Sequence, residues 1–465
     1  MIELAPERIA AEAGAEVLRA GPQDRPARAV IDSRGVEPGD LFFGLVGESV
    51  DGGEFAAGAL EAGAWGAVAR AEHARPLVAE GSPGWVLETT DPLSSLQRLA
   101  RAWRRELGCP VVGITGSTGK TSVKDITRAL LPLRAHASPE NYNTEIGLPL
   151  TVLAAPPETE GLVLEMAMRG RGQIAELCAI AEPDVAAITN VGPVHLELLG
   201  TVEAIAETKA EILAGLGEDG TAVVPADADA LAPHIEERLR TITFGPSGDV
   251  SARQVRIREG RASARIETPA GEMGFEFPFT EAHNVRNALC AIAIGLALVA
   301  DLEAMARRAP GITFSRLRGE LVGLAGGIVL VNDSYNANPI SMRAALDHLA
   351  GGVGGAAGDG RRVAVLGEMK ELGPETRAYH REIGAYARGV GVAPIVGVGE
   401  LAREYGPDEW VPRAEDAVEV VDALLEPGDA VLVKGSRSVG LELVADELRV
   451  RRGDGSPQQG PTAGT

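Results

Sequence analysis

Cysteine is scarce in this chain of 465 residues, which contains three. Cys109, Cys178 and Cys290 are far apart in the sequence, and each has apolar neighbours. Their spacing fits neither a disulfide framework nor a set of metal ligands. We therefore predict that all three are buried thiols.

Positive charge is also in short supply. The chain has 44 lysines and arginines against 66 aspartates and glutamates, which gives a formal net charge of −22. Nucleic-acid binding depends mainly on lysine and arginine at the phosphates, so this balance argues against a nucleic-acid partner. A local basic pocket for a small anionic substrate remains compatible with it.

Long apolar runs are missing as well. No uninterrupted run is long enough to span a membrane, and the acidic, amphipathic N-terminus lacks the apolar core of a signal peptide. We expect a cytoplasmic protein without a membrane partner. Hydrophobic residues make up 45% of the chain. That content and the length predict a globular protein of two to four domains.

The most informative segment is 113–121, Gly-Ile-Thr-Gly-Ser-Thr-Gly-Lys-Thr. It lies between an apolar stretch and residues with the apolar spacing of a helix. A glycine turn in that position directs backbone N–H groups and a helix N-terminus at a phosphate, and the lysine adds a positive charge. The segment misses the strict GxxxxGK(S/T) pattern, because Ile114 stands at its first glycine. We predict an ATP site made by Gly116, Ser117, Thr118, Gly119, Lys120 and Thr121, the last with its hydroxyl on Mg²⁺.

Polar residues also follow two later apolar stretches that we predict to be buried parallel strands. Glu165 ends the first, and His195 lies shortly after the second. Ligands of open parallel sheets bind at the carboxyl ends of the strands, so both residues would lie near the phosphate loop and could serve Mg²⁺. Each has a structural alternative. Glu165 could cap a helix, and His195 could be a satisfied structural histidine.

Four further polar segments are candidates for binding. Segments 141–147 and 283–287 are rich in amides, which could clamp phosphate or contact adenine, or could simply cap helices. Segment 332–339 concentrates polar groups where a strand turns into a helix that begins near 339–341, which is unusual for a plain loop. Segment 434–437, Lys-Gly-Ser-Arg, brings two cations to another strand end and suits an anion or a carboxylate.

The alternation of strand-like and helical stretches predicts an α/β fold with three domains and a tail. Residues 1–105 would form a small α/β domain, and 106–311 a central parallel-sheet domain that carries the phosphate loop. Residues 312–450 would form a smaller Rossmann-like domain. Residues 451–465 are polar and rich in glycine and proline, so we predict a disordered tail.

Taken in order, these motifs resemble those of the Mur ligases, ATP-dependent enzymes that form amide bonds in peptidoglycan synthesis. The similarity extends to about residue 450. It rests on 31–34, 38–42, the short phosphate loop, 190–197, 283–287, 333–339 and 434–437. Segment 333–339, Asp-Ser-Tyr-Asn-Ala-Asn-Pro, is the most discriminating. It resembles the branch that adds D-alanyl-D-alanine to UDP-N-acetylmuramoyl-tripeptide.

The resemblance implies a metal site beside the ATP phosphates. Lys120 and backbone amides would hold the phosphates. Four side chains would serve Mg²⁺, of which two ions are expected: Thr121, Glu165, His195 and Lys209. Lys209 falls where the family often has a carbamylated lysine, whose carboxylate helps to hold the second ion.

The resemblance also implies contacts from the other parts of the chain. Asn287 would contact the adenine, and Arg316 and Asp333 would complete the nucleotide site from the C-terminal domain. The N-terminal domain would hold the UDP-sugar. The residues expected to bind the UDP-sugar peptide or the amine are Ser33, Arg34, Asn143, Tyr335, Asn336, Asn338, Lys434 and Arg437.

This chain departs from the family pattern at several positions. Gly53 stands where histidine is usual, which bears on the contacts at the uracil end. The other departures are Thr144 for asparagine and Ala167, Ala210 and Ser315 for glycine. We expect the ATP chemistry to survive them, so any difference would concern the substrate.

The reaction follows from the chemistry of carboxylates. A carboxylate is a poor acyl donor, because its leaving group would be oxide. Transfer of the γ-phosphoryl group of ATP creates an acyl phosphate, which an amine attacks to form the amide. The protein must neutralise phosphate charge and exclude water, and domain closure would assemble the site. An α-amino group with a pKa of about 8 is partly neutral at cellular pH, so no general base is assigned.

Two alternatives stay open at this stage. One is a related ligase of the same type with a different carboxylate or amine. The other is a non-catalytic nucleotide-binding regulator, which the combination of Lys120, Glu165, His195, Lys209 and Asp333 argues against. We expect a monomer, and the sequence leaves the third residue of the tripeptide open.

Overall fold

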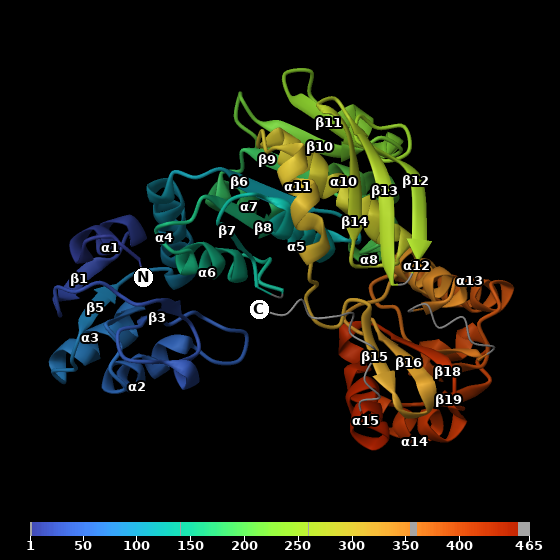
Figure 1. The fold of residues 1–465 in the computed structure, drawn as a ribbon. Helices are drawn as coiled ribbons and strands as arrows, with labels where there is room; N and C mark the ends of the chain where they lie inside the picture. Colours follow the sequence, from blue (N-terminus) through green and yellow to red (C-terminus); the bar gives the residue numbers. More distant parts are fainter. Residues whose placement is uncertain (1, 140, 259, 354–359, 454–465) are drawn as a thin grey trace, which may run out of the picture.

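The computed structural model describes residues 2–139, 141–258, 260–353 and 360–453. The chain forms an N-terminal, a central and a C-terminal part, coloured blue, green to yellow, and orange to red in Figure 1. The first and last parts lie apart from each other, each next to the central part. Most of the predicted tail, 454–465, lies outside the described residues, and the last helix ends at Arg452.

The N-terminal sheet has the order β1-β5-β4-β3-β2, with β1 antiparallel to β5 and the other neighbours parallel. Strands β3 and β4 are short and buried along their whole length, as expected where helices cover both faces of a parallel sheet. The strands are β1 Glu16–Arg19, β2 Ala29–Val30, β3 Leu41–Phe43, β4 Gly66–Ala69 and β5 Trp85–Glu88. The helices are α1 Pro6–Ala13, α2 Ala56–Glu61, α3 Ala71–Ala79 and α4 Pro92–Leu107, with 3₁₀ turns at Ser33–Gly35 and Gly52–Phe55.

The central sheet is entirely parallel, with the order β11-β10-β9-β6-β8-β7. Its strands confirm the prediction of parallel strands in this part. They are β6 Val111–Thr115, β7 Ala135–Ala137, β8 Gly161–Glu165, β9 Val185–Ile188, β10 Thr221–Pro225 and β11 Arg240–Phe244. The helices are α5 Lys120–Leu130, α6 Gly147–Ala154, α7 Gln173–Ala181, α8 Leu196–Leu199, α9 Val202–Ala214, α10 Ala282–Ala297 and α11 Leu302–Arg308.

A three-stranded antiparallel sheet inside the central part was absent from the sequence interpretation. It consists of β12 Ser251–Arg258, β13 Arg261–Thr268 and β14 Gly271–Phe277. In β13, Ala262, Ala264 and Ile266 are buried while the residues between them are more exposed. This alternation with period two is the pattern of a sheet covered on one face, and it was available in the sequence.

The C-terminal sheet has the order β15-β16-β20-β17-β18-β19, with only β15 antiparallel to its neighbour. Together with the other sheets it confirms the predicted α/β class. Its strands are β15 Glu320–Leu324, β16 Ile328–Asn332, β17 Arg362–Gly367, β18 Ile395–Val398, β19 Glu409–Val411 and β20 Ala430–Lys434. The helices are α12 Pro339–Ala350, α13 Thr376–Gly389, α14 Ala414–Leu424 and α15 Glu442–Arg452.

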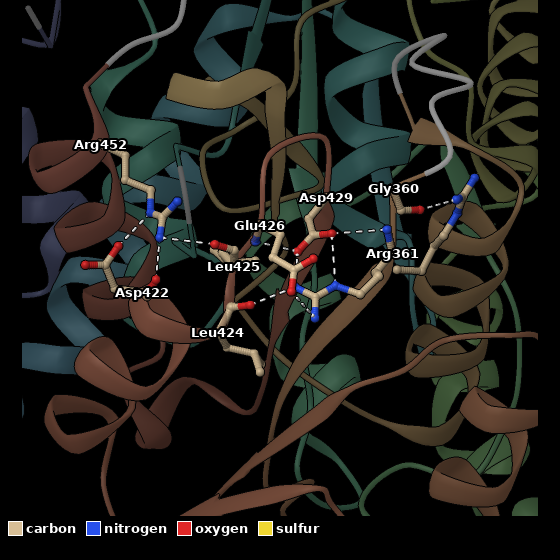
Figure 2. Close-up of polar contacts among 9 residues, drawn as sticks. Gly360, Arg361, Asp422, Leu424, Leu425, Glu426, Asp429 and Arg452 are labelled. Carbon is tan, nitrogen blue, oxygen red and sulfur yellow. Dashed lines mark hydrogen bonds and ion pairs between the residues drawn. The ribbon is translucent and has the colours of Figure 1, made fainter.

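The starts of β17 and β20 are joined by an ion pair at what we call the amino edge of this sheet (Figure 2). Arg361 donates from Nη2 to Oδ2 of Asp429 at 2.7 Å and from its backbone N–H to Oδ1 at 3.1 Å. The same guanidinium donates to the carbonyl of Leu424 at 2.7 Å, and the Glu426 N–H donates to Asp429 at 2.8 Å. This closed set of bonds fixes the two strands side by side.

The three cysteines are buried thiols, as predicted. Cys109, Cys178 and Cys290 are all free and buried. Burial raises the pKa of Cys178 to about 12, so this thiol is unreactive near neutral pH. No helix of the described residues has the length and apolar character needed to cross a membrane.

Candidate active site

A cavity of about 1110 Å³ lies between the carboxyl ends of the central and C-terminal sheets. It brings together most of the predicted site residues. These are Ser117, Thr118, Gly119, Lys120, Thr121, Asn143, Glu165, His195, Lys209, Asn287, Asp333, Tyr335, Asn336, Asn338, Lys434 and Arg437. Gly116, Ser33, Arg34 and Arg316 are predicted residues that do not line it.

The position of the cavity follows from the strand order. Strand β6 lies between β8 and β9, so the chain leaves β6 toward one side of the sheet and later crosses to the other. A crevice forms at such a switch point, outside the carboxyl ends of the strands. The phosphate loop after β6, Glu165 at the end of β8 and Asn190 after β9 therefore meet there.

The phosphate loop is held tightly against the segment after β9. Thr118 donates its N–H to Oδ1 of Asn190 at 2.9 Å. Gly116 has φ 152°, and a Cβ atom there would lie 1.9 Å from Oγ1 of Thr189, so a larger residue does not fit. Gly119, with φ 77°, precedes the first residue of α5. The N-terminus of α5 and the loop amides are thus fixed before any anion binds.

Lys120, the first residue of α5, is held inside the loop by a bond from Nζ to the Gly116 carbonyl at 2.9 Å. Loss of hydration lowers the pKa of Lys120, and the nearby carboxylate of Glu165 works in the opposite direction. This lysine can supply a positive charge to a phosphate bound at the loop.

Glu165 lies at the centre of a group of oxygen atoms. Thr121 donates its hydroxyl to Oε2 of Glu165 at 2.8 Å, and Asn143 donates its amide to Oε1 at 2.8 Å. Neither partner is a helix-capping amide, so the alternative role for Glu165 as a helix cap finds no support. A carboxylate and a hydroxyl beside a phosphate loop fit the oxygen ligands that Mg²⁺ prefers.

Lys209 projects from α9 into the cavity with 2% of its surface exposed. Within the described residues its ammonium has no hydrogen-bond or ion-pair partner. Burial lowers the pKa of Lys209 well below its usual value, and the charge of Lys120 lowers it further. The side chain is therefore held toward its neutral, nucleophilic amine form.

His195 is joined to the C-terminal part by a residue that sequence reasoning missed. Its Nδ1 lies 2.5 Å from Oε2 of Glu371, which follows β17. The hydrogen bond from His195 lowers the pKa of Glu371. Nothing in the local sequence marks Glu371, because the contact joins segments far apart in the chain. This hydrogen bond fixes the imidazole at the edge of the cavity.

The carboxyl ends of β16 and β20 face the phosphate loop across the cavity. Lys434 is almost fully buried, with Nζ 2.5 Å from Oδ2 of Asp333, and it also donates to the carbonyl of Asn336 at 2.9 Å. Asn338 also has a structural role. Its Oδ1 accepts the Ser341 N–H at 2.9 Å as the N-cap of α12. The cap engages only the oxygen of this amide, and Asn338 also lines the cavity, so its role toward the substrate stays a prediction.

Arg318 lines the cavity, whereas Arg316, the arginine predicted from the sequence, does not. Arg316 is exposed and does not line the cavity. Arg318 lines it and donates from Nη2 to Oγ1 of Thr121 at 3.0 Å, with its guanidinium 3.8 Å from the ring centre of Tyr335. The two arginines are separated by one residue, Leu317, which has φ 63°. This left-handed turn reverses the chain locally, and residue spacing does not predict it.

The predicted N-terminal residues lie at a second place, the carboxyl end of β2. Ser33 and Arg34 form a 3₁₀ turn there, and Arg34 is bonded to Asp32 through Nε at 2.9 Å and Nη2 at 2.7 Å. The side chain of Arg34 is 88% exposed. The structure thus separates these two residues from the cavity.

The same edge of the N-terminal sheet carries a histidine that the sequence did not single out. A Cβ atom at Gly53 would lie 2.4 Å from Cδ2 of His73, so the imidazole fills the space beside this glycine. Nε2 of His73 lies 3.0 Å from Oδ2 of Asp51, which also pairs with Arg70. Burial would raise the pKa of Asp51, but bonds from the Gly53 N–H, Arg70 and His73 outweigh it and lower that pKa to about 2.

Comparison with known proteins gives three matches to Mur ligase family models. Residues 114–295 match the Mur ligase middle domain, and 317–437 match the model described as Mur ligase, glutamate ligase domain. Residues 29–102 match the model described as Mur ligase family, catalytic domain. The matches cover the phosphate loop, the C-terminal strand ends and the edge that carries Ser33.

Curated relatives match over nearly their whole length. A UDP-N-acetylmuramoyl-tripeptide--D-alanyl-D-alanine ligase of Bacillus subtilis (strain 168) is 36% identical over 429 residues, covering 90% of this chain and 92% of its own. The Mycobacterium tuberculosis (strain H37Rv) protein of the same name is also 36% identical, covering 96% of this chain and 98% of its own.

Solved structures of MurF enzymes also match this chain. MurF from Acinetobacter baumannii is 28% identical with a TM-score of 0.85, over 96% of this chain and 98% of its own. MurF from Thermotoga maritima in complex with ADP is 30% identical with a TM-score of 0.78, over 91% and 98%.

Proposed function

Because the chain belongs to the Mur ligase family, we propose that it is the ATP-dependent ligase that joins D-alanyl-D-alanine to UDP-N-acetylmuramoyl-tripeptide in peptidoglycan synthesis. The observation that carries the proposal is one cavity in which a phosphate loop faces the Asp333–Lys434 pair of a second sheet. Relatives of that name, aligned over 90% or more of this chain, support the choice of substrates.

In this proposal the phosphate loop holds ATP while the tripeptide carboxylate attacks its γ-phosphorus. The acyl phosphate that forms then accepts the amine of D-alanyl-D-alanine, and inorganic phosphate leaves. Lys120, the loop amides and the N-terminus of α5 stabilise the phosphate charge. The Thermotoga maritima relative, solved in complex with ADP, supports the binding of an adenine nucleotide by this chain. Asn287 lies against Gly119 of the loop, and we assign it to the nucleotide.

We propose that Thr121 and Glu165 hold Mg²⁺, which when bound would neutralise phosphate charge. His195 would serve the metal site from its edge, because Glu371 occupies Nδ1 and leaves Nε2 as the nitrogen able to bind a metal or its water. The Glu165 carboxylate and the Thr121 hydroxyl, bonded at 2.8 Å, are the observation that fits such a site.

A second Mg²⁺ would need another anionic ligand, and we propose that Lys209 supplies it as a carbamate. The neutral amine of Lys209 would attack carbon dioxide and lose a proton to give the carbamate anion. The low pKa and the missing counter-charge of the unmodified lysine support this assignment. Rescue of Lys209→Ala by a short-chain carboxylic acid, with no such rescue of Lys120→Ala, is the expected result. A free ammonium in a crystal structure grown with bicarbonate would contradict it.

We assign the nucleotide contact from the C-terminal part to Arg318 instead of Arg316. Arg318 lines the cavity beside Thr121, whereas Arg316 is exposed. Asp333 and Lys434, with Tyr335, Asn336 and Arg437 nearby, would bind the peptide and the amine. Arg318→Ala should lower turnover by about 100-fold, and Arg316→Ala should leave it within about two-fold.

We propose that the N-terminal part holds the UDP-sugar through Ser33, Arg34 and the Asp51–His73 group. Both lie at the carboxyl edge of a parallel sheet, where ligands bind. The division at about residues 105 and 311 follows the separation of the sheets, and we propose that the three parts close around the substrates. A monomer that works in the cytoplasm is the simplest arrangement. Light scattering would test the oligomeric state.

The direct test is a reaction with purified UDP-N-acetylmuramoyl-tripeptide, D-alanyl-D-alanine, ATP and Mg²⁺. Stoichiometric release of ADP and phosphate, with a product heavier by the dipeptide, is expected. Tripeptides that differ at the third residue would define that preference. No ADP with any of them, but ADP with another carboxylate and amine, would replace this function by that of a related ligase.

Lys120→Ala is the matched inactive control for this assay. Turnover should fall by at least about 100-fold, because the loop loses its charge on the phosphates. The thermal unfolding temperature should stay close to that of the wild type. The substitution removes an ammonium group whose burial costs hydration energy, and this offsets the loss of its hydrogen bond. Near-normal phosphate release by this variant would contradict the assignment of the loop.

A further inference from the structure

The linker between the central and C-terminal parts is bound to helix α5 at two successive turns. The backbone N–H and the hydroxyl of Ser315 both donate to Oδ2 of Asp125, each at 2.8 Å. Three residues later, Arg318 donates to Oγ1 of Thr121 at 3.0 Å. Thr121 and Asp125 are four residues apart in α5 and therefore lie on one face of the helix. The linker thus runs back along the first turns of the helix that carries the phosphate loop.

The carboxylate of Asp125 is fixed on its other side as well. Asp125 is 4% exposed, and its Oδ1 lies 3.4 Å from Nζ of Lys124. That ammonium is itself bonded to the carbonyl of Ser138 at 2.7 Å. Hydrogen bonds to an ionised carboxylate are short and strong, so Oδ2 is a rigid attachment point for the linker.

We infer that Asp125 is a positioning residue for Arg318, acting through Ser315. The bond at Ser315 sets where the linker leaves α5, and this brings the guanidinium of Arg318 to the Thr121 hydroxyl. Tyr335 lies on the face of the same guanidinium, 3.8 Å away. The inference rests on the proposed function where it concerns catalysis. The test itself measures only the binding of an ATP analogue.

Ser315 is one of the departures noted in the sequence, since glycine is usual at that position in the family. Its N–H bond to Asp125 is available to any residue except proline. The hydroxyl adds a second bond of the same length to the same oxygen. This chain therefore has a tighter attachment than glycine would provide, and removal of the hydroxyl should loosen it without abolishing it.

The test is a double-mutant cycle read by calorimetric binding of a non-hydrolysable ATP analogue with Mg²⁺. Asp125→Asn should weaken binding by about five-fold and Ser315→Ala by about two-fold, because Arg318 is no longer held at Thr121. Arg318→Ala should weaken it at least as much as Asp125→Asn. In the Arg318→Ala background, Asp125→Asn should have almost no further effect.

A matched control is available in Thr243, near the end of β11, and Asp249, in the turn that follows, because they repeat the bonding pattern. The N–H and hydroxyl of Thr243 donate to Oδ2 of Asp249 at 2.8 and 2.7 Å, and neither residue lines the cavity. Thr243→Ala should leave analogue binding unchanged. A loss in this control as large as that in Ser315→Ala would reduce the effect to general stability and overturn the inference.

The outcomes separate this inference from the proposed function. If Asp125→Asn weakens binding equally with and without Arg318, the positioning role is overturned, whatever substrates the wild type uses. A second outcome is that the variants show the predicted coupling while the wild type forms no product from the UDP-tripeptide and D-alanyl-D-alanine. In that case the proposed function fails and the positioning role stands. Should Asp125→Asn fail to fold, Ser315→Ala carries the same cycle.

Discussion

The two ends of the C-terminal sheet each carry an ion pair between neighbouring strands, but they differ in what surrounds it. At the carboxyl end, Lys434 has 2% of its side chain exposed and pairs with Asp333, which is 21% exposed. At the amino edge, Asp429 is 2% exposed and pairs with Arg361, which is 35% exposed (Figure 2). In each pair one charge is buried and the other reaches solvent or the cavity.

The partners of the two pairs distinguish them. Asp429 accepts from the side chain and backbone of Arg361 and from Glu426, so neighbouring groups of the same edge satisfy it. Asp333 and Lys434 instead line the cavity opposite the phosphate loop. A charge at a strand end is therefore a weak sign of a site. The edge of the sheet at which it lies decides between binding and stability.

The largest effect should come from breaking the pair at the carboxyl end. Asp333→Asn keeps the shape of the side chain but removes the charge beside Lys434 and the bound substrates. We expect kcat/KM to fall by about 100-fold, as for loss of one preorganised electrostatic contact. Steady-state kinetics and urea unfolding would be measured together. A variant that is unstable but fully active would make this end resemble the amino edge.

The converse change is at the amino edge. Asp429→Ala should lower the free energy of unfolding by about 2 kcal/mol, because the Glu426 N–H and the guanidinium of Arg361 lose their acceptor. Solvent reaches Arg361, which keeps the loss below that of a fully buried pair. Turnover at 25 °C should stay within about two-fold of wild type. A large loss of kcat in a folded Asp429→Ala protein would contradict the comparison.

A smaller effect should follow from Arg361→Lys, which keeps the charge. Lysine cannot bond both Asp429 and the Leu424 carbonyl in the planar geometry of arginine. We expect a loss of about 1 kcal/mol in the free energy of unfolding, with unchanged activity. Equal stability of this variant and the wild type would mean that charge alone holds the edge.

The smallest expected effect is on the stability of the protein at acid pH. Burial raises the pKa of Asp429, but hydrogen bonds from Arg361 and the Glu426 N–H outweigh it, and the net pKa is lowered. A lowered pKa in the folded state adds stability above the unfolded value of about 3.9, which is lost as the pH falls through the folded pKa. The stability difference between wild type and Asp429→Ala should therefore shrink below about pH 4. A difference that stays constant down to pH 2 would contradict this.

The features that the sequence predicts well are those that depend on residues close together in the chain. The phosphate loop, the parallel strands around it and the polar ends of β16 and β20 are local patterns. The strand order then brings Glu165, Asp333 and Lys434 to one cavity. Segment 333–339 likewise indicated a functional strand end, although it contains Asn338, whose side chain caps a helix.

What the sequence missed depends on contacts between distant segments or on one backbone angle. Glu371 reaches His195 from another part of the chain. Arg318, and not the predicted Arg316, lines the cavity, and Leu317 between them has a left-handed backbone conformation. The antiparallel sheet β12–β14 differs from these cases, because the period-two pattern of β13 is a local feature of the sequence.

The close approach of His73 to Gly53 couples substitutions at the two positions. A histidine entering at residue 53 would meet the imidazole already beside it, because a Cβ atom there lies 2.4 Å from Cδ2 of His73. A side chain at residue 53 therefore requires the imidazole of His73 to move, and that movement would leave Asp51 with one partner fewer. The two positions are therefore epistatic.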